Sequence, residues 1–239
     1  KLQKGYINYI LHIVLTMENK MIPNAVIFDW DITLVNSVDA IHGALEDTFI
    51  KYSNQEEAWS REEVLHWLSR SMRVSFKDIF GDKASSAASY FYQEYKNRHL
   101  KNITLAEGAS YTLEILLDLG VYLAVVSSKR GDLVREEAGI LDLKSYFKKI
   151  IGSADAAEDK PEMAPMKLAI ENANFNLDNN VWYVGDCGID VVCARKSSCY
   201  SIILGSSPAY VGETVHNPDI YFSNHKEFHE FIKKTCKYT

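Results

Sequence analysis

The chain has 239 residues, a formal net charge of −6 and a hydrophobic fraction of 47%. This is enough apolar material for a folded core and too much for a disordered chain. A protein dedicated to nucleic acid carries a basic balance or a basic patch, and this acidic sequence has neither, so we expect no nucleic-acid partner.

The amino-terminal segment 6–16 is apolar, with Lys1 and Lys4 before it. It is too short to span a bilayer, which takes about 20 residues, and no small-residue cleavage site follows it. We therefore predict that residues 1–23 form an N-terminal extension, rather than a targeting peptide, and that the protein has no membrane partner.

The cysteines do not form a recognisable framework. There are four of them, without a CxxC pair and without zinc-finger spacing: Cys187, Cys193, Cys199 and Cys236. A chain without a disulfide framework fits a reducing compartment, so we predict a cytoplasmic location.

The first predicted element is a buried strand over 24–28, because the sequence NAVIF is mostly apolar on both faces. Apolar residues then recur with a helical period from Ser37 to about Leu100. Within this stretch, residues 60–63 resemble a capping box, and 84–100 predict a helix with an aromatic face. We interpret 37–103 as a helical domain inserted after the first strand.

From 104 onward, helices and strands alternate. Apolar patterns predict helices over 107–119, 132–138, 165–173, 189–194 and 225–236, and strands over 121–126, 149–152, 181–184 and 201–204. Such alternation is typical of an α/β protein with a parallel sheet that has helices on both faces. The predicted core domain consists of residues 24–36 and 104–239.

Polar side chains follow the predicted strands and precede one helix. They are Asp29 and Asp31 after the first strand, Ser127-Ser128-Lys129 after the second, Asp186 and Asp190 after the strand at 181–184, and Lys160 in a loop. In open parallel sheets, ligands bind at the carboxyl ends of the strands. We therefore expect these groups to converge at one edge of the sheet.

Three crowded carboxylates, Asp29, Asp31 and Asp186, repel one another and require a compensating positive charge. An all-oxygen set of ligands suits Mg²⁺, which also bridges to phosphate. Lys160 and the Ser127 hydroxyl then have a role as partners of phosphate oxygens.

This set of groups can transfer a phosphoryl group. Asp29 can attack phosphorus as a nucleophile, and Asp31 can protonate the leaving oxygen and then deprotonate the attacking water. Each signal is weak alone, because an aspartate after a strand is common turn chemistry and Asp190 suits a helix N-terminus. The prediction rests on their order along the chain.

Four segments together resemble the motifs of the haloacid dehalogenase-like superfamily. The sequence VIFDWDITLVNS resembles its first motif, VVSSK its second, DKP at 159–161 its third and VGDCGID its fourth. The resemblance covers about 24–204. The helical insertion after the first motif is similar to the cap of the phosphoglycolate phosphatase-like branch.

The resemblance implies a Rossmann-like parallel sheet with an inserted α-helical cap domain, Mg²⁺ as cofactor and an aspartyl-phosphate intermediate. By this resemblance, Asp29 is the nucleophile and a metal ligand, and Asp31 is the acid/base with its carbonyl on the metal. It further implies phosphate binding by Ser127, Ser128 and Lys160, metal binding by Asp186, and support of the site by Asp190.

Three positions depart from the family's pattern. Ile32 stands where glycine is common, Met163 where a second proline is common, and Asn36 where an aspartate is common. None of these departures removes a reacting group. Asp31 argues against a dehalogenase, whose chemistry does not need this acid/base.

The predicted function is a Mg²⁺-dependent phosphatase acting on a small phosphomonoester, with phosphoglycolate as the family-level expectation. The alternatives are a phosphomutase that uses the same residues, a signalling receiver and a non-catalytic phosphate-binding relic. A receiver is disfavoured because its phospho-acceptor lies on a later strand, away from its acidic pair.

The substrate is not readable from the sequence, and neither is the oligomeric state. The predicted cap offers generic candidates for substrate contacts: His42, Arg70, Arg73 and Lys77. Each of these side chains could equally be a solvated surface group.

Overall fold

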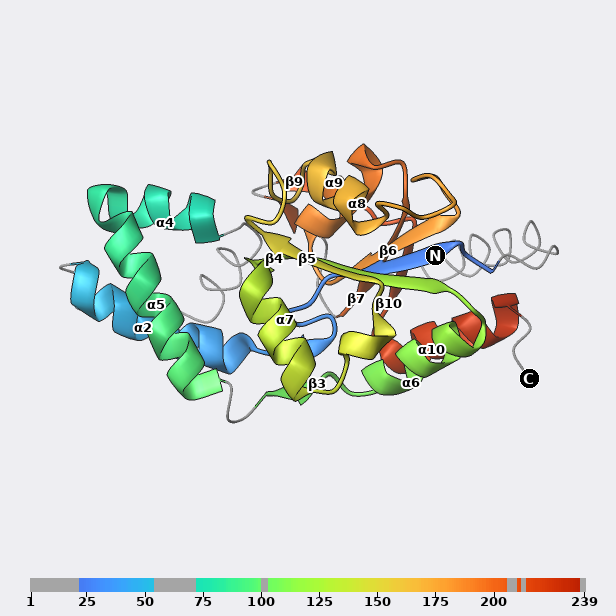
Figure 1. Ribbon diagram of the computed structural model, residues 1–239, viewed down its shortest axis with the longest axis horizontal. Helices are drawn as coiled ribbons and strands as arrows, with labels where there is room; N and C mark the ends of the chain where they lie inside the picture. Colours follow the sequence, from blue (N-terminus) through green and yellow to red (C-terminus); the bar gives the residue numbers. More distant parts are fainter. Residues whose placement is uncertain (1–21, 54–71, 100–102, 206–209, 212–213, 237–239) are drawn as a thin grey trace, which may run out of the picture.

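The structure is a computed structural model, which describes residues 22–53, 72–99, 103–205, 210–211 and 214–236 (Figure 1). Almost all of the predicted N-terminal extension, and the capping box predicted at 60–63, lie outside these residues.

The centre of the molecule is a six-stranded sheet in the order β10-β7-β6-β1-β4-β5, with every neighbouring pair parallel. Its strands are β1 (Ala25–Phe28), β4 (Tyr122–Arg130), β5 (Lys149–Ser153), β6 (Val181–Gly185), β7 (Tyr200–Leu204) and β10 (Ile220–Phe222). All four residues of β1 are buried, as its apolar sequence predicts.

Helices cover both faces of the sheet. One face carries α6 (Ala109–Asp118), α7 (Gly131–Ile140) and α10 (His225–Cys236), and the other carries α8 (Met163–Ala169) and α9 (Gly188–Lys196) (Figure 1). Successive strand residues point to opposite faces. In β1, Val26 and Phe28 therefore pack on the first group of helices, and Ala25 and Ile27 pack on the second.

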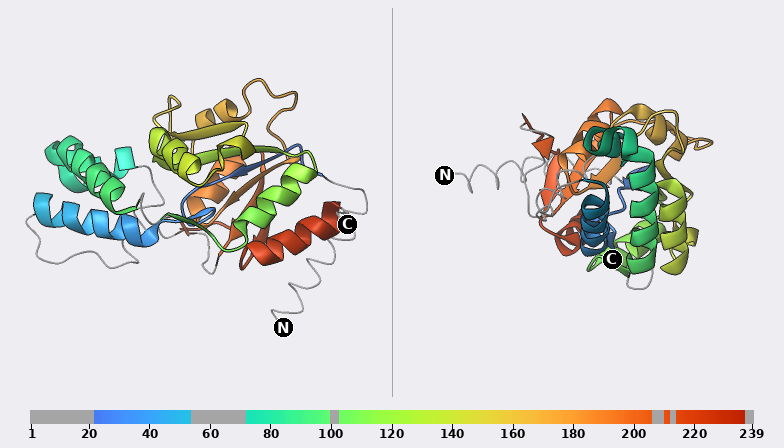
Figure 2. Two further views of the ribbon diagram at one scale, coloured as in Figure 1. Left: turned by 60° about the horizontal axis from the view of Figure 1, so that its bottom comes forward. Right: turned by 90° about the vertical axis from the view of Figure 1, so that its left-hand side faces the viewer.

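Residues after β1 form a separate helical layer at one end of the molecule, seen on the left of Figure 1 and in the left view of Figure 2. It contains α2 (Val38–Tyr52), α4 (Met72–Phe80), the short helix η1 (Gly81–Lys83) and α5 (Ala84–His99). An aromatic cluster that includes Phe76, Phe80 and Phe91 holds these helices together. The predicted fold class, a parallel α/β core with an inserted helical cap, is confirmed.

The chain enters and leaves the cap through two short paired strands, β2 (Val35–Asn36) and β3 (Thr104–Leu105). The Asn36 side chain joins them, because its Nδ2 donates to Leu105 O at 2.9 Å and to Thr104 Oγ1 at 3.1 Å. The predicted cap boundaries, 37 and 103, lie beside this pair. The division into domains stays a prediction.

Several predicted boundaries were wrong. Helix α6 begins at Ala109 rather than 107, because Gly108 before it has a left-handed φ of 82°. Helix α8 begins two residues before Pro165 and ends at Ala169, short of the left-handed residue Asn172. Pro165 fits the first turn because the N–H groups there have no partner within the helix.

The sequence patterns also missed strand β10, which has only three residues, and ended β4 too early. The serines and lysine of the second motif belong to the end of β4, where the register against β5 shifts between Val126 and Arg130. The remaining short elements are η2 (Lys144–Tyr146), β8 (Tyr210–Val211) and β9 (Thr214–Val215). None of the helices described is both long enough and apolar enough to cross a membrane.

One buried histidine ties α10 to the loop after β1. The carbonyl of Thr33 accepts a hydrogen bond from His225 Nε2 at 2.8 Å, and His225 Nδ1 lies 3.1 Å from Thr112 Oγ1. Burial lowers the pKa of His225, although the bond to Thr33 partly opposes this effect. The ring is therefore more easily protonated in the unfolded chain than in the folded protein.

We expect the free energy of unfolding to decrease as the pH falls from about 7.5 to about 5.5, because protonation of His225 favours the unfolded state. His225→Gln should lose part of this dependence in urea denaturation curves. His229→Gln is the matched control, since His229 is on the same helix and contacts the exposed Tyr111 ring. Equal pH dependence in both variants would contradict the assignment.

Candidate active site

The site lies where the strand order reverses. Strand β1 is central, and the chain builds β4 and β5 on one side of it before β6, β7 and β10 on the other. Ligand sites of open α/β sheets lie at such switch points, beyond the carboxyl ends of the strands. Phe28, the last residue of β1, is in register with Val125 and Val184. Asp29 therefore lies near the end of β6 and beside β4 just before its motif residues 127–129.

Lys160 connects the first and fourth motifs through a buried ammonium group. Its Nζ donates to Asp29 Oδ1 at 2.8 Å, to Asp190 Oδ1 at 2.7 Å and to the Tyr183 hydroxyl at 3.0 Å. An ammonium has three protons, so these partners satisfy it completely. Burial opposes its charge, but Asp190 and Asp29 overcome this effect and raise the pKa of Lys160 well above its ordinary value.

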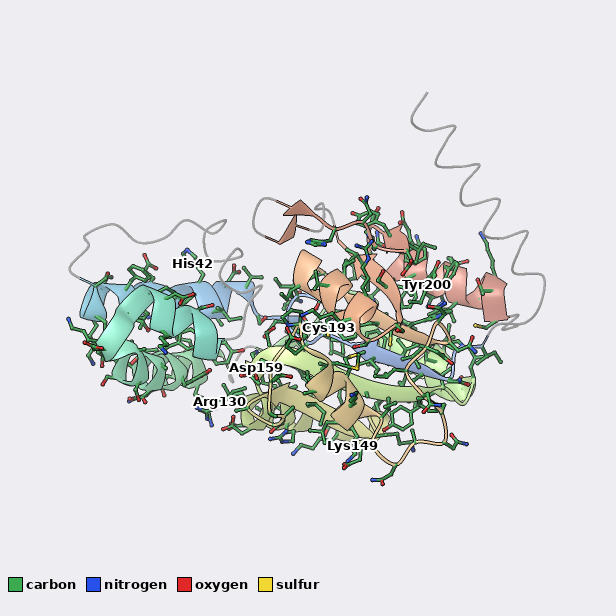
Figure 3. The ribbon with its side chains drawn as sticks, turned by 90° about the horizontal axis from the view of Figure 1, so that it is seen from above. His42, Arg130, Lys149, Asp159, Cys193 and Tyr200 are labelled. Carbon is green, nitrogen blue, oxygen red and sulfur yellow. The ribbon has the colours of Figure 1, made fainter. Side chains whose placement is uncertain are left out.

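The loop that carries Lys160 is fixed by Asp159. One Asp159 oxygen accepts from the Ser153 hydroxyl at 2.9 Å, and the other accepts from the Ala154 backbone N–H at 3.1 Å. Figure 3 labels Asp159 between the sheet and the cap. In the DKP motif, Asp159 therefore anchors the loop to the end of β5, and Lys160 enters the site.

Asp190 orders the loop of the fourth motif. Its Oδ2 accepts from the backbone N–H groups of Asp186 and Cys187, each at 3.1 Å, in a capping box at the start of α9. Gly185 is required here, since a Cβ at this position would lie 2.3 Å from the Asp190 carboxyl group. Asp190 thus supports Asp186 and Lys160 at once.

Asp186 is half-buried at the end of β6, and the Thr33 hydroxyl donates to its Oδ1 at 3.3 Å. Burial, and then the charges of Asp190 and Asp29, raise the pKa of Asp186 well above its ordinary value. Burial also raises the pKa of Asp29 to about 6, against the opposing effect of Lys160. In both groups burial is the largest cause of the shift, and neighbouring carboxylates add to it.

Asp31 has a second lysine as its partner. Lys129 Nζ donates to Asp31 Oδ1 at 2.6 Å, and its side chain is only 7% exposed. The sequence analysis singled out the serines beside Lys129 and gave Lys129 no role. The available signal was a lysine at the same strand end as those serines, opposite a second aspartate.

Ser127 is buried near the end of β4, and its Oγ accepts from the Lys129 backbone N–H at 3.2 Å. Ser128 follows it and is half-buried. The phosphate-binding roles of the two serines stay predictions.

Of the predicted site residues, the structure brings together Asp29, Lys160, Asp186 and Asp190 through direct bonds or charge interactions.

Ile32 lies in the loop between the two motif aspartates and the cap, with a φ of 67°. This left-handed conformation favours glycine and is unfavourable for a β-branched residue. The loop is closed by backbone bonds from Ile32 N to Val35 O at 2.8 Å and from Leu34 N to Trp30 O at 2.9 Å. Isoleucine instead of glycine at position 32 therefore does not prevent the hydrogen bonds that close the loop, but it has a strained backbone there.

The structure describes three of the four candidate substrate contacts of the cap, on α2 and α4. His42 is half-buried on α2, as labelled in Figure 3, and Lys77 is exposed on α4. The Arg73 backbone belongs to α4, whereas Arg70 lies outside the described residues.

The donor set fits a hard divalent cation. Asp186, Cys187 and Asp190 offer ligand atoms within 4.8 Å of one another. Both Asp190 oxygens already accept hydrogen bonds, and burial raises the pKa of the Cys187 thiol well above its ordinary value, which disfavours the thiolate. Asp186, with the charge of Asp29 beside it, is the better candidate, and carboxylate oxygens are ligands that Mg²⁺ prefers.

The family is shown by comparison with known proteins. The family model described as haloacid dehalogenase-like hydrolase matches residues 26–204, which is most of the chain. The chain therefore belongs to the haloacid dehalogenase-like hydrolases. The predicted resemblance, and the predicted enzyme class of phosphatase-type hydrolases, are confirmed.

Two named relatives cover most of the chain at low identity. The pyrophosphatase PpaX of Bacillus pumilus is 25% identical over 88% of this chain and 93% of its own length. The phosphoglycolate phosphatase of Aquifex aeolicus is 28% identical over 72% of this chain and 80% of its own length.

A solved structure with the same fold is that of a predicted phosphoglycolate phosphatase from Haemophilus somnus. It superposes with a TM-score of 0.75 at 21% identity, over 89% of this chain and 99% of its own length. At this identity the similarity supports the fold alone.

We expect Lys160→Met to lower the free energy of unfolding by about 3–5 kcal/mol, because it leaves Asp29 and Asp190 buried without their ammonium partner. Lys196→Met is the matched control, since its ion pair with Glu162 is exposed on both sides. This control should change stability by about 0–1 kcal/mol. Urea denaturation in EDTA measures both, and equal losses would contradict the structural role of Lys160.

Proposed function

We propose that the protein is a Mg²⁺-dependent phosphatase that hydrolyses a small phosphomonoester through an aspartyl-phosphate on Asp29. One observation carries this proposal. A single buried ammonium, that of Lys160, bonds both Asp29 and Asp190, while Asp186 adjoins the same group of charges. A nucleophile, a charge-stabilising cation and a candidate metal ligand therefore occupy one switch point of the sheet.

The first step is transfer of the phosphoryl group to Asp29. Among the described contacts, Lys160 bonds Oδ1 of Asp29, so we assign the attack on phosphorus to Oδ2. The bond from phosphorus to the ester oxygen breaks, and this oxygen takes a proton from Asp31. Lys160 stabilises the negative charge of the transferring group.

The second step regenerates the enzyme. Asp31, now ionised, takes a proton from water, and the water oxygen attacks the phosphorus atom of the aspartyl-phosphate. The bond between phosphorus and Asp29 breaks, which releases inorganic phosphate and the free carboxylate. Asp31 returns to its protonated form for the next cycle.

Mg²⁺ would be held by Asp29, the Asp31 carbonyl and Asp186, where it supplies positive charge against the phosphate oxygens. The raised pKa values of Asp29 and Asp186 support this assignment, because a cation beside them would favour their ionised forms. Asp190 would remain outside the ligand set, occupied by Lys160 and by the loop after β6.

The relatives indicate a class of substrate but not a particular compound. The two relatives are named for different substrates, pyrophosphate and phosphoglycolate. Both names specify small phosphorylated compounds, and the proposal for this chain is of the same class. Side chains of the cap, such as His42 and Lys77, are candidates for selecting among them.

The proposal predicts phosphate release from at least one member of a panel of phosphoglycolate, pyrophosphate, p-nitrophenyl phosphate and a hexose monophosphate. Release should need Mg²⁺, stop with EDTA and return when Mg²⁺ is added in excess. Asp29→Asn should reduce turnover by at least about 10⁴-fold, because it removes the nucleophile. A molybdate assay for inorganic phosphate measures each of these rates.

Asp132→Asn is the matched control, because Asp132 is exposed on α7 and pairs with Arg130. It should retain wild-type turnover. Equal activity of Asp29→Asn and the wild type would contradict the mechanism. An isomerised hexose phosphate without phosphate release would instead identify a phosphomutase.

A further inference from the structure

A buried carboxylate that the phosphatase mechanism does not use lies next to the site. Glu137 on α7 is 0% exposed. Its Oε2 accepts from Trp30 Nε1 at 2.6 Å, and its Oε1 accepts from the Tyr95 hydroxyl at 2.8 Å. Lys129 Nζ lies 3.0 Å from each of the two oxygens. Each of the two carboxylate oxygens of Glu137 therefore has two hydrogen-bond partners.

Lys129 is equally saturated. Its ammonium donates to Asp31 at 2.6 Å, to the Tyr95 hydroxyl at 2.6 Å and to Glu137. Tyr95 accepts from Lys129 and donates to Glu137, so the three groups form a closed ring of hydrogen bonds. A lysine side chain has many rotamers in solution, and these partners restrict Lys129 to one position, against Asp31.

The residues of this ring come from different parts of the molecule. Trp30 separates the two motif aspartates, Lys129 is the next-to-last residue of β4, Glu137 belongs to α7 and Tyr95 belongs to cap helix α5. Tyr95 is 1% exposed, so the cap contributes a fully buried group to the core. Its hydroxyl is one of the three acceptors that hold Lys129.

Stability is a weak explanation for this ring. In a buried ion pair, the free energy needed to remove both charges from water cancels most of their attraction. A protein with well-packed apolar side chains of similar volume at the same positions is often as stable. Here burial raises the pKa of Glu137, against the effect of Lys129, which records this cost. The geometry offers a more specific reason, since the ring ends on Asp31.

We propose that Glu137 is a positioning residue: with Trp30 and Tyr95 it fixes Lys129 against Asp31, so that the acid/base carboxylate is correctly oriented when the cap helix is in place. The inference rests on the proposed function, because it assigns Asp31 the proton transfers. Glu137 acts through Lys129, and Tyr95 makes the arrangement depend on the cap.

The contribution of the buried ring can be distinguished from that of neighbouring contacts between cap and core. Lys96 and Glu136 also join α5 to α7, at 2.5 Å, but their side chains are 39% and 40% exposed. Arg130 lies over the ring of Tyr92, 4.4 Å from its centroid, at the border between cap and core seen in Figure 3. The first pair connects the same two helices, and the second connects α5 to Arg130 at the end of β4. Both pairs lie outside the ring and supply matched controls.

The test compares esters with good and poor leaving groups. p-Nitrophenolate departs without a proton, whereas the alkoxide of an alkyl phosphate must be protonated as it leaves. The ratio kcat/KM depends on every step up to the transfer of the phosphoryl group onto Asp29. It is therefore sensitive to the protonation of the leaving oxygen, which occurs in that step. Glu137→Gln and Tyr95→Phe should lower kcat/KM for the alkyl phosphate by about 10- to 100-fold and leave that for p-nitrophenyl phosphate little changed.

The controls are Glu136→Gln and Tyr92→Phe, which make the same chemical changes beside the ring and should retain both values of kcat/KM. Tyr95→Phe removes a single hydroxyl, so it tests the inference even where Glu137→Gln unfolds. Equal losses on both esters, or no loss on either, would overturn the inference while the phosphatase function stands. A wild type inactive on both esters would overturn the proposed function and, with it, the role of Glu137.

Discussion

The buried ammonium of Lys160 is the interaction on which the site depends. It bonds Asp29, directly after the first strand, and Asp190 from the fourth motif, where the two residues are only 6% and 1% exposed. Without that cation, ionised carboxylates this close would repel each other and pay the full cost of burial. The loop fixed by Asp159 and the glycine at 185 both hold this contact in place.

A second lysine repeats the arrangement for the other motif aspartate. Lys129 pairs with Asp31 and with the buried Glu137, so each aspartate of the first motif has its own ammonium partner. The two lysines do not balance the five carboxylates of the region, which are Asp29, Asp31, Glu137, Asp186 and Asp190. Burial raises the pKa values of Asp29, Glu137 and Asp186, and neighbouring carboxylates add to this effect. If all five carboxylates ionised, an excess of three negative charges would remain. A divalent cation and the proton that Asp31 carries for the leaving group would together relieve it.

The sequence alone predicted the architecture well, because its strands are strongly apolar and their polar residues stand at the carboxyl ends. The buried strand 25–28 and the convergence of Asp29, Lys160 and Asp186 follow from these patterns. Strand β10 was missed because three residues carry too little periodicity. The boundaries of α8 were wrong because Pro165 tolerates any place in the first turn.

The ring around Glu137 was beyond the reach of sequence patterns for a different reason. Its bonds join residues 107, 42 and 8 positions apart, and nothing local marks them. Tyr95 belongs to the helix for which the sequence predicts an aromatic face, and it is 1% exposed. Its polar function lies in one hydroxyl that only the tertiary structure aligns with Lys129 and Glu137.

The central claim is that Asp29 carries the phosphoryl group, and the most direct test is to locate the covalent intermediate. The enzyme is mixed with substrate and Mg²⁺, quenched during turnover and treated with borohydride, which reduces an aspartyl-phosphate to homoserine. Peptide mapping by mass spectrometry then identifies the modified position. The account predicts homoserine at position 29, dependent on substrate. Modification of another residue, or an unmodified Asp29 in an enzyme that is turning over, would contradict it.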